Sequence, residues 1–354
     1  MRAEHLGQLC KRCSVHEATL TVRNEPLCKE CFSKYIHTKV VKRMEAFRTR
    51  HASATQERKL LLPISLGVSS VTLLHILDRH LQGQKQKTGR VGFSLHVLYV
   101  RSPERTDDLA IKFNAVKEAY PNHTFSMIDL ETLFTEKENL RTILDSLPSA
   151  TSAADVLSIL QKRLAVEFAK LHSCEGILWG DSTTKLAEKV LVETSKGRGF
   201  SLPWQVGDGA SPYSIPFYYP MRDVLKKELI AHSRLTDPPL ALLMDTRVFE
   251  TTQAPPSAKD TTIDVVMKGY FEDVEQSFPS VISNVVRTTE KLIAPKAKED
   301  VARCRLCVLP LPEGRSGVRD WGGHQEEQNE PDPGTRLCYG CSRSIPERLI
   351  PLLP

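Results

Sequence analysis

The sequence lacks any long apolar run. Its longest hydrophobic stretch, Leu60 to Val68, is interrupted by Pro63 and Ser65 and falls far short of the ~20 apolar residues that a membrane-spanning helix needs. The opening residues, MRAEHLGQLCKRC, contain no apolar segment of the kind that a secretory signal requires. These absences predict an intracellular protein without a membrane segment.

Thiols are almost absent from the middle of the chain. Of nine cysteines, only Cys174 lies between Cys31 and Cys304. The other eight form four Cys-x-x-Cys pairs: Cys10/Cys13, Cys28/Cys31, Cys304/Cys307 and Cys338/Cys341. In a reducing compartment, such pairs indicate metal binding and not disulfides. Cys174 precedes an apolar strand and is expected to be a small buried side chain.

The spacing of the cysteines predicts two tetrahedral four-cysteine zinc sites. Two thiols three positions apart on a turn can face one ion, and a second such turn completes the site. Fourteen residues separate the two N-terminal pairs and thirty the two C-terminal pairs. Four thiolates leave no open position for a substrate, so both sites should be structural. An iron–sulfur cluster is the alternative that the ligand type leaves open, whereas redox Cys-x-x-Cys motifs usually occur singly.

Between the cysteine modules, apolar strands alternate with helical patterns. We expect strands at residues 60–67, 91–100, 125–130 and 176–179, and helices at 71–81, 108–120, 153–171, 183–194 and 223–235. This alternation predicts a parallel sheet with helices on both faces. The Gly- and Pro-rich segment 195–222 is expected to be a long loop or flap over the carboxyl edge of the sheet.

Changes in composition predict five segments along the chain. They are an N-terminal zinc module (1–33), a basic helix or linker (34–58), an α/β domain (59–249), a linker followed by helices near 263–277 and 281–293 (250–300), and a C-terminal zinc module (301–354). Residues 250–262 read as a linker. The polar stretch 312–335 reads as a flexible insertion within the second module.

Positive charge is concentrated at the N-terminus. Residues 1–59 contain thirteen Lys and Arg against six Asp and Glu, in a chain of net charge +5. The segment KYIHTKVVKRMEAFRTRH would, as a helix, place Tyr35, Ile36, Val40, Met44 and Phe47 on one apolar stripe and most bases on the other side. This asymmetry favours a polyanionic partner, although a solvated helix face has the same pattern.

The stretch PISLGVSS, at the end of the first strand of the α/β domain, lies where a nucleotide-binding protein places its phosphate loop. It resembles the Ser-Gly-Gly-x-Asp-Ser loop of the PP-loop ATP pyrophosphatases, with Ser65, Gly67 and Ser70 matching. Leu66 replaces the first Gly and Ser69 replaces the Asp. The Leu crowds the backbone approach to phosphate, and the missing carboxylate removes a ligand for magnesium, so ATP binding is doubtful.

The PP-loop superfamily includes tRNA sulfurtransferases, the active thiolases, and their later motifs are altered here in the same way. Those enzymes have a Cys-x-x-Cys before the long middle helix and a Gly-His-Asn-x-x-Asp loop, and the matching stretches here are residues 152–155 (SAAD) and 180–184 (GDSTT). The lone cysteine that follows the later helix in the family also has no counterpart. Sulfur transfer requires a thiolate, so we expect no catalytic residue in this chain.

The motifs together resemble the cytoplasmic tRNA 2-thiolation protein 2 family. The matching text is CKRCSVHEATLTVRNEPLCKECF, KVVKRMEAFR, LLLPISLGVSSVTLLHIL, WGDSTTKLAEKVL, GRGFSLPW and CRLC…CYGC. The resemblance implies a Rossmann-like PP-loop fold and a cytoplasmic, non-catalytic subunit that forms a heterodimer with the active PP-loop thiolase. It also implies sulfur supplied by a thiocarboxylated ubiquitin-related modifier, 2-thiolation of the wobble uridine in Lys, Glu and Gln tRNAs, and a role in protein urmylation.

A tRNA partner gives the basic residues a role. The predicted tRNA contacts are Lys34, Lys39, Lys42, Arg43, Arg48 and Arg50, with Lys196 and Arg198 as a second, weaker pair. Three other interpretations stay open. The chain would be an active ATP-dependent tRNA sulfurtransferase, a zinc-ribbon scaffold without an RNA role, or a nucleotide sensor. In the absence of a nucleotide, the loop serines would serve only as helix caps.

Overall fold

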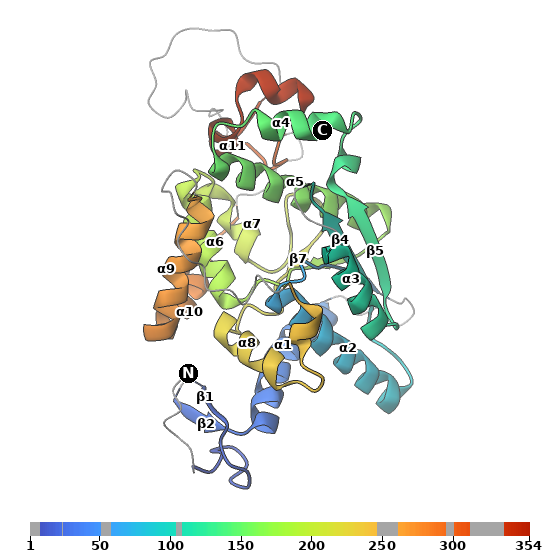
Figure 1. The fold of residues 1–354 in the computed structure, drawn as a ribbon, viewed down its shortest axis with the longest axis vertical. Coiled ribbons are helices and arrows are strands. Elements are labelled where there is room, and N and C mark those ends of the chain that lie inside the picture. Colours follow the sequence, from blue (N-terminus) through green and yellow to red (C-terminus); the bar gives the residue numbers. More distant parts are fainter. Residues whose placement is uncertain are drawn as a thin grey trace.

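The computed structural model describes residues 8–22, 24–50, 58–103, 108–245, 261–294, 301–311 and 336–354. For residues 46–50 it describes the backbone alone. Most of the expected linker 250–262 and the whole expected insertion 312–335 lie outside these ranges. Figure 1 shows the sheet near the middle of the molecule, with the β1–β2 hairpin at one end of the long axis and α11 at the other.

A five-stranded parallel sheet organises the molecule. Its strands are β3 (Lys59–Pro63), β4 (Ser94–Arg101), β5 (Thr124–Asp129), β6 (Gly176–Leu178) and β7 (Phe217–Tyr218), in the order β5-β4-β3-β6-β7. Every pairing is parallel, which confirms the expected α/β class. The chain adds strands on one side of β3 and then on the other, so the switch point lies between β3 and β6.

Helices cover both faces of the sheet. They are α2 (Val68–Thr88), α3 (Asp108–Ala119), α5 (Ala150–Leu171), α6 (Thr183–Ser195) and α8 (Lys226–Leu235). Alternate residues of β3 enter two separate apolar clusters. Leu61 packs with α5, α6 and the C-terminal module, whereas Leu60 and Leu62 pack with α2, α3, α8 and the N-terminal module. Because both faces are buried, these strands are continuous apolar runs.

Each terminal module belongs to one of these two clusters. The N-terminal module consists of the hairpin β1 (Leu20–Val22) and β2 (Glu25–Leu27), followed by α1 (Lys29–Arg50). The predicted boundary at residue 33 falls inside α1. The stripe predicted on this helix is buried at Ile36, Val40 and Met44. The C-terminal module contributes α11 (Tyr339–Ser344) and the 3₁₀ helix η8 (Glu347–Leu352).

The segment 195–222 differs from the expected loop or flap. It forms η2 (Gly199–Ser201), α7 (Leu202–Val206) and the edge strand β7. Trp204, Phe217 and Tyr219 are buried in the cluster with α5 and α6, so the segment is part of the core. The segment has little helical periodicity, but its aromatic residues were a sign in the sequence that it is buried.

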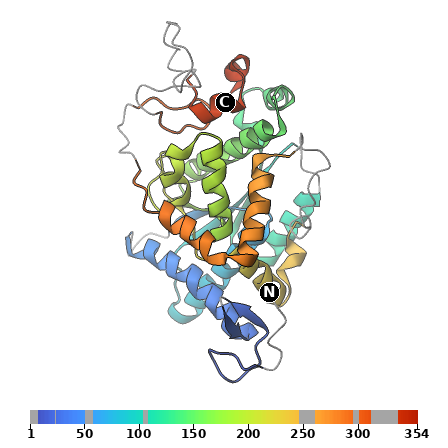
Figure 2. The same ribbon diagram turned by 90° about the vertical axis from the view of Figure 1, so that its left-hand side faces the viewer.

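The remaining short elements complete the layers. They are η1 (Leu130–Leu133), α4 (Glu138–Asp145), η3 (Leu240–Leu243), α9 (Ile263–Ser277) and α10 (Pro279–Thr289). Figure 2 shows α9 and α10, in orange, beside α6. The range 263–277 was predicted correctly, while α10 begins two residues earlier and ends four residues earlier than the predicted 281–293.

Candidate functional site

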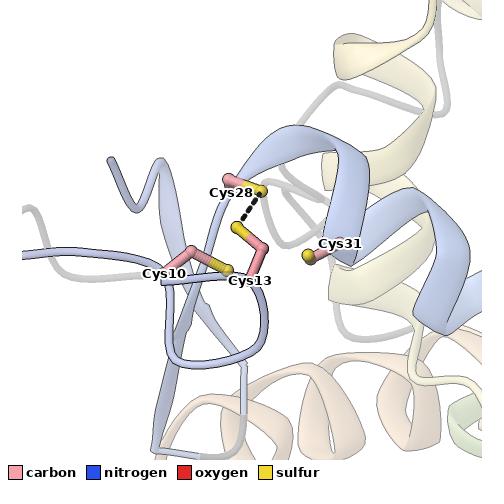
Figure 3. Close-up of side chains that lie close together, drawn as sticks. All are labelled: Cys10, Cys13, Cys28 and Cys31. Carbon is pink, nitrogen blue, oxygen red and sulfur yellow. Dashed lines mark hydrogen bonds between the residues drawn. The ribbon is translucent and has the colours of Figure 1, made fainter. Parts of the chain in front are cut away.

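The four N-terminal cysteines come together in one cluster. Cys10 and Cys13 lie on a turn closed by a bridge between Leu9 and Glu17, and Cys28 and Cys31 lie at the start of α1. Figure 3 shows the four thiols converging from these two elements, and their sulfurs all lie within 4.8 Å of one another. Backbone N–H groups of the turn lower the pKa of Cys13 to about 5, whereas burial raises the pKa of Cys28 and of Cys31.

The four C-terminal cysteines form a second cluster of the same construction. Cys304 and Cys307 lie on a turn closed by a bridge between Arg303 and Pro310, and Cys338 and Cys341 flank the start of α11. Their sulfurs also lie within 4.8 Å of one another. All four are buried, whereas two N-terminal cysteines are partly exposed. Both sets therefore fit a tetrahedral metal ion held by thiolates alone.

The degenerate phosphate loop keeps the shape that glycine would provide. Leu66 has φ = 60°, in the left-handed region where an L side chain is strained, and its side chain is fully buried in the cluster with α2. Its carbonyl accepts a hydrogen bond from the N–H of Asp245 at 2.9 Å. Gly67 caps α2 in an extended conformation. The loop therefore follows a glycine-like path while its side chain fills the core.

The loop serines bond mainly within the loop. The Oγ of Ser70 lies 3.3 Å from the Oγ of Ser65 and donates to the carbonyl of Gly67 at 3.2 Å. A side chain at Gly180 would meet the Cα of Ser70 at 3.0 Å, so the ends of β6 and the start of α2 are closely packed. Ser69 is partly exposed and supplies no carboxylate for magnesium.

A crevice of about 710 Å³ opens beside this loop, at the switch point of the sheet. Several charges that line it already have partners. Lys185 binds Glu188 at 2.8 Å and Lys189 binds Asp181 at 2.7 Å. Lys162 donates to the amide oxygen of Gln205 at 2.8 Å, and burial lowers its pKa to about 7. Ion pairs and a hydrogen bond thus join side chains that line the crevice.

Residues 152–155, where the resemblance predicts the counterpart of a thiol pair, contribute to a buried ion cluster. Asp155, near the start of α5, accepts two hydrogen bonds from Arg198, at 2.9 and 2.5 Å, and lies 3.1 Å from the Nζ of Lys196. Burial would raise the pKa of the Asp155 carboxyl, but the Arg198 charge lowers it below its ordinary value. Glu193 binds the other side of Arg198 at 2.7 Å.

This finding corrects the prediction that Lys196 and Arg198 contact tRNA. Their side chains are 6% and 2% exposed, and their charges are neutralised internally, so neither presents charge to an RNA phosphate. From the sequence, Asp155 was predicted only to stand at the position of a missing thiol. An acidic residue on the apolar side of a helix, with two basic residues 41 and 43 positions later, was the available signal.

The same cluster attaches the C-terminal metal module to the α/β domain. The hydroxyl of Ser344 donates to Asp155 at 2.7 Å. A Cβ at Gly340, between the last two cysteines, would lie 2.6 Å from Arg198. Gly197 has φ = 80°, and a Cβ there would lie 2.3 Å from the ring of Tyr339. The Gly-Arg-Gly loop and the Cys-Tyr-Gly-Cys turn therefore interlock, with a glycine of each segment packed against a side chain of the other.

The basic helix α1 divides its predicted tRNA contacts into two groups. Lys34 and Lys42 are exposed. Lys39 donates to the carbonyl of Asp223 at 2.7 Å, and Arg43 binds the Asp223 carboxylate at 2.7 Å, so both attach α1 to the segment before α8. Arg48 and Arg50 lie at the end of α1, outside the described side chains.

The single central thiol, Cys174, lies away from the crevice. It precedes β6 and is therefore at the amino-terminal edge of the sheet, whereas the crevice is at the carboxyl edge. Its side chain is 8% exposed, and burial raises its pKa. This matches the expectation of a small buried side chain.

No helix in the described ranges is long and apolar enough to cross a bilayer.

Among solved structures, the fold is similar to the U34-tRNA thiolase NcsA from Methanococcus maripaludis, which was solved with its 4Fe-4S cluster. The TM-score is 0.61 at 14% identity, with 85% of this chain and 92% of that chain covered. At this identity the likeness concerns the fold alone. The chain therefore has the PP-loop α/β fold, with a four-cysteine cluster near each end.

Sequence relatives identify the family. A model of cytoplasmic tRNA 2-thiolation protein 2 matches residues 262–321. The proteins of that name from Phaeosphaeria nodorum and Pyrenophora tritici-repentis are 48% and 45% identical, over 97% and 96% of this chain and 96% and 94% of theirs. The chain belongs to the cytoplasmic tRNA 2-thiolation protein 2 family, as its motifs predicted.

The two clusters differ in exposure, which predicts a difference in metal release. The native chain should hold one ion per cluster, and Cys13→Ser and Cys341→Ser should each lose one. A chelator should remove the N-terminal ion first. Cys341→Ser should lower the unfolding midpoint more, because Cys341 is fully buried whereas Cys13 is partly exposed. Elemental analysis and thermal unfolding test this, and equal destabilisation by both changes would contradict it.

Removal of Asp155 should be costly. Asp155→Ala leaves Arg198 and Lys196 buried with fewer partners, and breaking a buried ion pair costs about 3–5 kcal/mol. Asp264→Ala removes the other partner of Lys196 at a carboxylate that is 38% exposed and should cost below about 1 kcal/mol. Urea unfolding at pH 7 measures both. Equal losses of unfolding free energy in the two variants would show that burial of the carboxylate does not determine its contribution to stability.

The same variant has a defined pH dependence. The folded-state pKa of Asp155 lies below the unfolded value of about 3.9. Its stabilisation is therefore fully present above that pH and is lost as pH falls toward the folded pKa. The difference between native chain and Asp155→Ala should be constant from pH 7 to about pH 5 and should shrink in stronger acid.

Proposed function

We propose that this chain is the non-catalytic subunit of a tRNA thiolase heterodimer. The observation that carries the proposal is the ion cluster around Asp155, because it fills with paired charges the place where sulfur chemistry would need a thiolate. Arg198 and Ser344 occupy both oxygens of this carboxylate, so it is not available as a base or a metal ligand.

The phosphate loop supports the same proposal. Leu66 occupies the glycine position and Ser69 the carboxylate position, so magnesium lacks the ligand that would hold it against a triphosphate. Cys174, at the opposite edge of the sheet, has no access to that loop. The alternative of an active ATP-dependent sulfurtransferase would need both a nucleophile and a metal ligand at positions where this chain has neither.

A partner must then supply the chemistry. We assign that part to a PP-loop thiolase with an intact loop and central thiols, with the sulfur coming from a thiocarboxylated ubiquitin-related modifier and going to the wobble uridine of Lys, Glu and Gln tRNAs. A role in protein urmylation and a cytoplasmic location belong to the same proposal. The two cysteine clusters are assigned as structural zinc sites, since four thiolates leave no coordination position open.

The helices α9 and α10 offer a surface for that partner. Exposed large apolar side chains recur there, at Val266, Tyr270, Phe278 and Val281, each more than 40% exposed. Exposed apolar patches commonly mark protein interfaces. Both helices lie inside the range that the family model matches, 262–321, which supports a partner contact characteristic of this family. A scaffold without an RNA role would not account for the thiolase fold around it.

The division of labour can be tested by reconstitution. The chain alone, given ATP, magnesium, tRNA and a sulfur donor, should form no 2-thiouridine, and the partner subunit should form it only when this chain is added. The interface is tested with Tyr270→Glu combined with Phe278→Glu. This variant should weaken co-purification with the partner while leaving the fold of the chain intact. Mass spectrometry of the tRNA nucleosides is the readout. Repeated turnover by the chain alone would overturn the proposal.

The exposed bases of α1 should contribute to tRNA binding. Lys34→Ala with Lys42→Ala removes two positive charges that have no partner among the described residues, so the slope of log K against log salt should fall by about 2. Lys117→Ala with Lys137→Ala, two exposed lysines elsewhere, is the matched control. Filter binding of the heterodimer measures both, and equal slopes would exclude α1 as a tRNA contact.

A further inference from the structure

A second groove lies apart from the crevice, between α1, α2 and the end of α8. Its volume is about 800 Å³. Phe32 and Ile76, both buried, contribute an apolar floor, and Phe32 lies against the imidazole of His232 with ring centroids 6.3 Å apart. Planar rings and aliphatic carbons therefore form the inner part of this groove.

Two imidazoles in the groove, His75 half-buried and His232 buried, each have one nitrogen without a partner among the described residues. His75 uses its Nδ1 with the hydroxyl of Tyr120 at 3.1 Å, and His232 uses its Nε2 with the hydroxyl of Ser33 at 3.5 Å. Within the described residues, Nε2 of His75 and Nδ1 of His232 are buried and unbonded. His232 is only 3% exposed. A buried unpaired nitrogen is costly, so these atoms call for a ligand.

The imidazoles are neutral at pH 7. Burial lowers the pKa of His75 and of His232 to about 4, and the charge of nearby Arg79 acts in the same direction. A neutral imidazole presents one donor and one acceptor nitrogen. Among the described residues, no three ligand atoms from these histidines lie within 4.8 Å of one another, which disfavours a metal ion.

The rim of the groove is positively charged. Four exposed basic residues line it, and none of them forms a salt bridge with another described residue: Lys29, Lys34, Arg79 and Lys87. Glu30 and Asp237 also line the groove, so an excess of positive charge remains. Cations around an aromatic and imidazole floor are the chemistry by which proteins hold single-stranded nucleic acid.

We propose that this α1–α2–α8 groove holds one unpaired nucleotide of an RNA. The base enters the groove above Phe32 and His232 with its polar edge toward the two unbonded imidazole nitrogens, while the flanking phosphates lie at the basic rim. The inference rests on the proposed function, because that function makes tRNA the RNA in question. Lys34 then contacts a phosphate at the edge of a base pocket, and the contact favours unpaired RNA over duplex.

Gly83 provides a way to close the groove without disturbing the fold. It lies within α2 and lines the groove, and a Cβ built there meets nothing within 4 Å. Gly83→Leu extends a side chain into the groove and replaces a poor helix former with a good one, so thermal stability should not fall. Gly269→Leu on α9, where a Cβ is equally unobstructed, is the matched control.

The experiment measures binding of the purified full-length chain to a short labelled single-stranded RNA and to a hairpin duplex of the same length. Gly83→Leu should weaken single-strand binding about 10-fold, as expected for the loss of one stacked base, with duplex binding unchanged. Gly269→Leu should change neither. Equal effects of the two variants, or equal losses for single strand and duplex, would overturn the proposal.

Two further measurements distinguish this proposal from a free-nucleotide site and from a failure of the proposed function. Uridine and adenosine monophosphates are titrated into the native chain, and binding of either as tight as that of the RNA would make the groove a free-nucleotide site and overturn the RNA assignment. Thiolation by the reconstituted heterodimer is measured separately. Absence of thiolation with the single-strand preference intact would count against the proposed function and leave the groove assignment standing.

Discussion

The carboxylate of Asp155 is the contact on which the architecture depends. It joins α5, the loop after α6 and the C-terminal metal module through Arg198, Lys196 and Ser344. Each of these groups is buried, so each needs its partners to offset the cost of leaving water. The geometry is therefore cooperative, and it holds the Gly-Arg-Gly loop against the Cys-Tyr-Gly-Cys turn.

The two metal modules extend the two halves of the core. One cluster continues from the face of α2 and α3 into the N-terminal cysteines, and the other from α5 and α6 into the C-terminal cysteines. The two four-cysteine modules thus lie at opposite ends of the molecule (Figure 1). Each end is braced by a turn of the same design, in which a hairpin turn and a helix start bring four thiols together.

Much of this arrangement could be predicted from the residues. The parallel sheet followed from apolar runs separated by helical periods, and the cysteine clusters from their spacing, because both depend on local pattern. The roles of Lys196, Arg198 and Asp155 could not be read in this way, since charged residues on a sequence look alike whether they face solvent or one another. The short elements within 195–222 were also missed, because their burial depends on packing against distant helices.

The basic helix illustrates the same limit. Spacing predicted its buried stripe at Ile36, Val40 and Met44. Only the folded arrangement shows that Lys39 and Arg43 both bind Asp223, whereas Lys34 lines a groove. The groove itself combines residues nearly two hundred positions apart. Pairings over such distances have no signature in a single sequence.

Leu66 has a consequence beyond the absent glycine. Its side chain is anchored in the interior while its backbone follows the left-handed path, and its carbonyl is tied to the segment after η3. The loop is thus held in shape by hydrocarbon contacts and needs no bound triphosphate to become ordered. A loop held in this way keeps one conformation without a nucleotide, and a protein that contacts it meets a preformed surface.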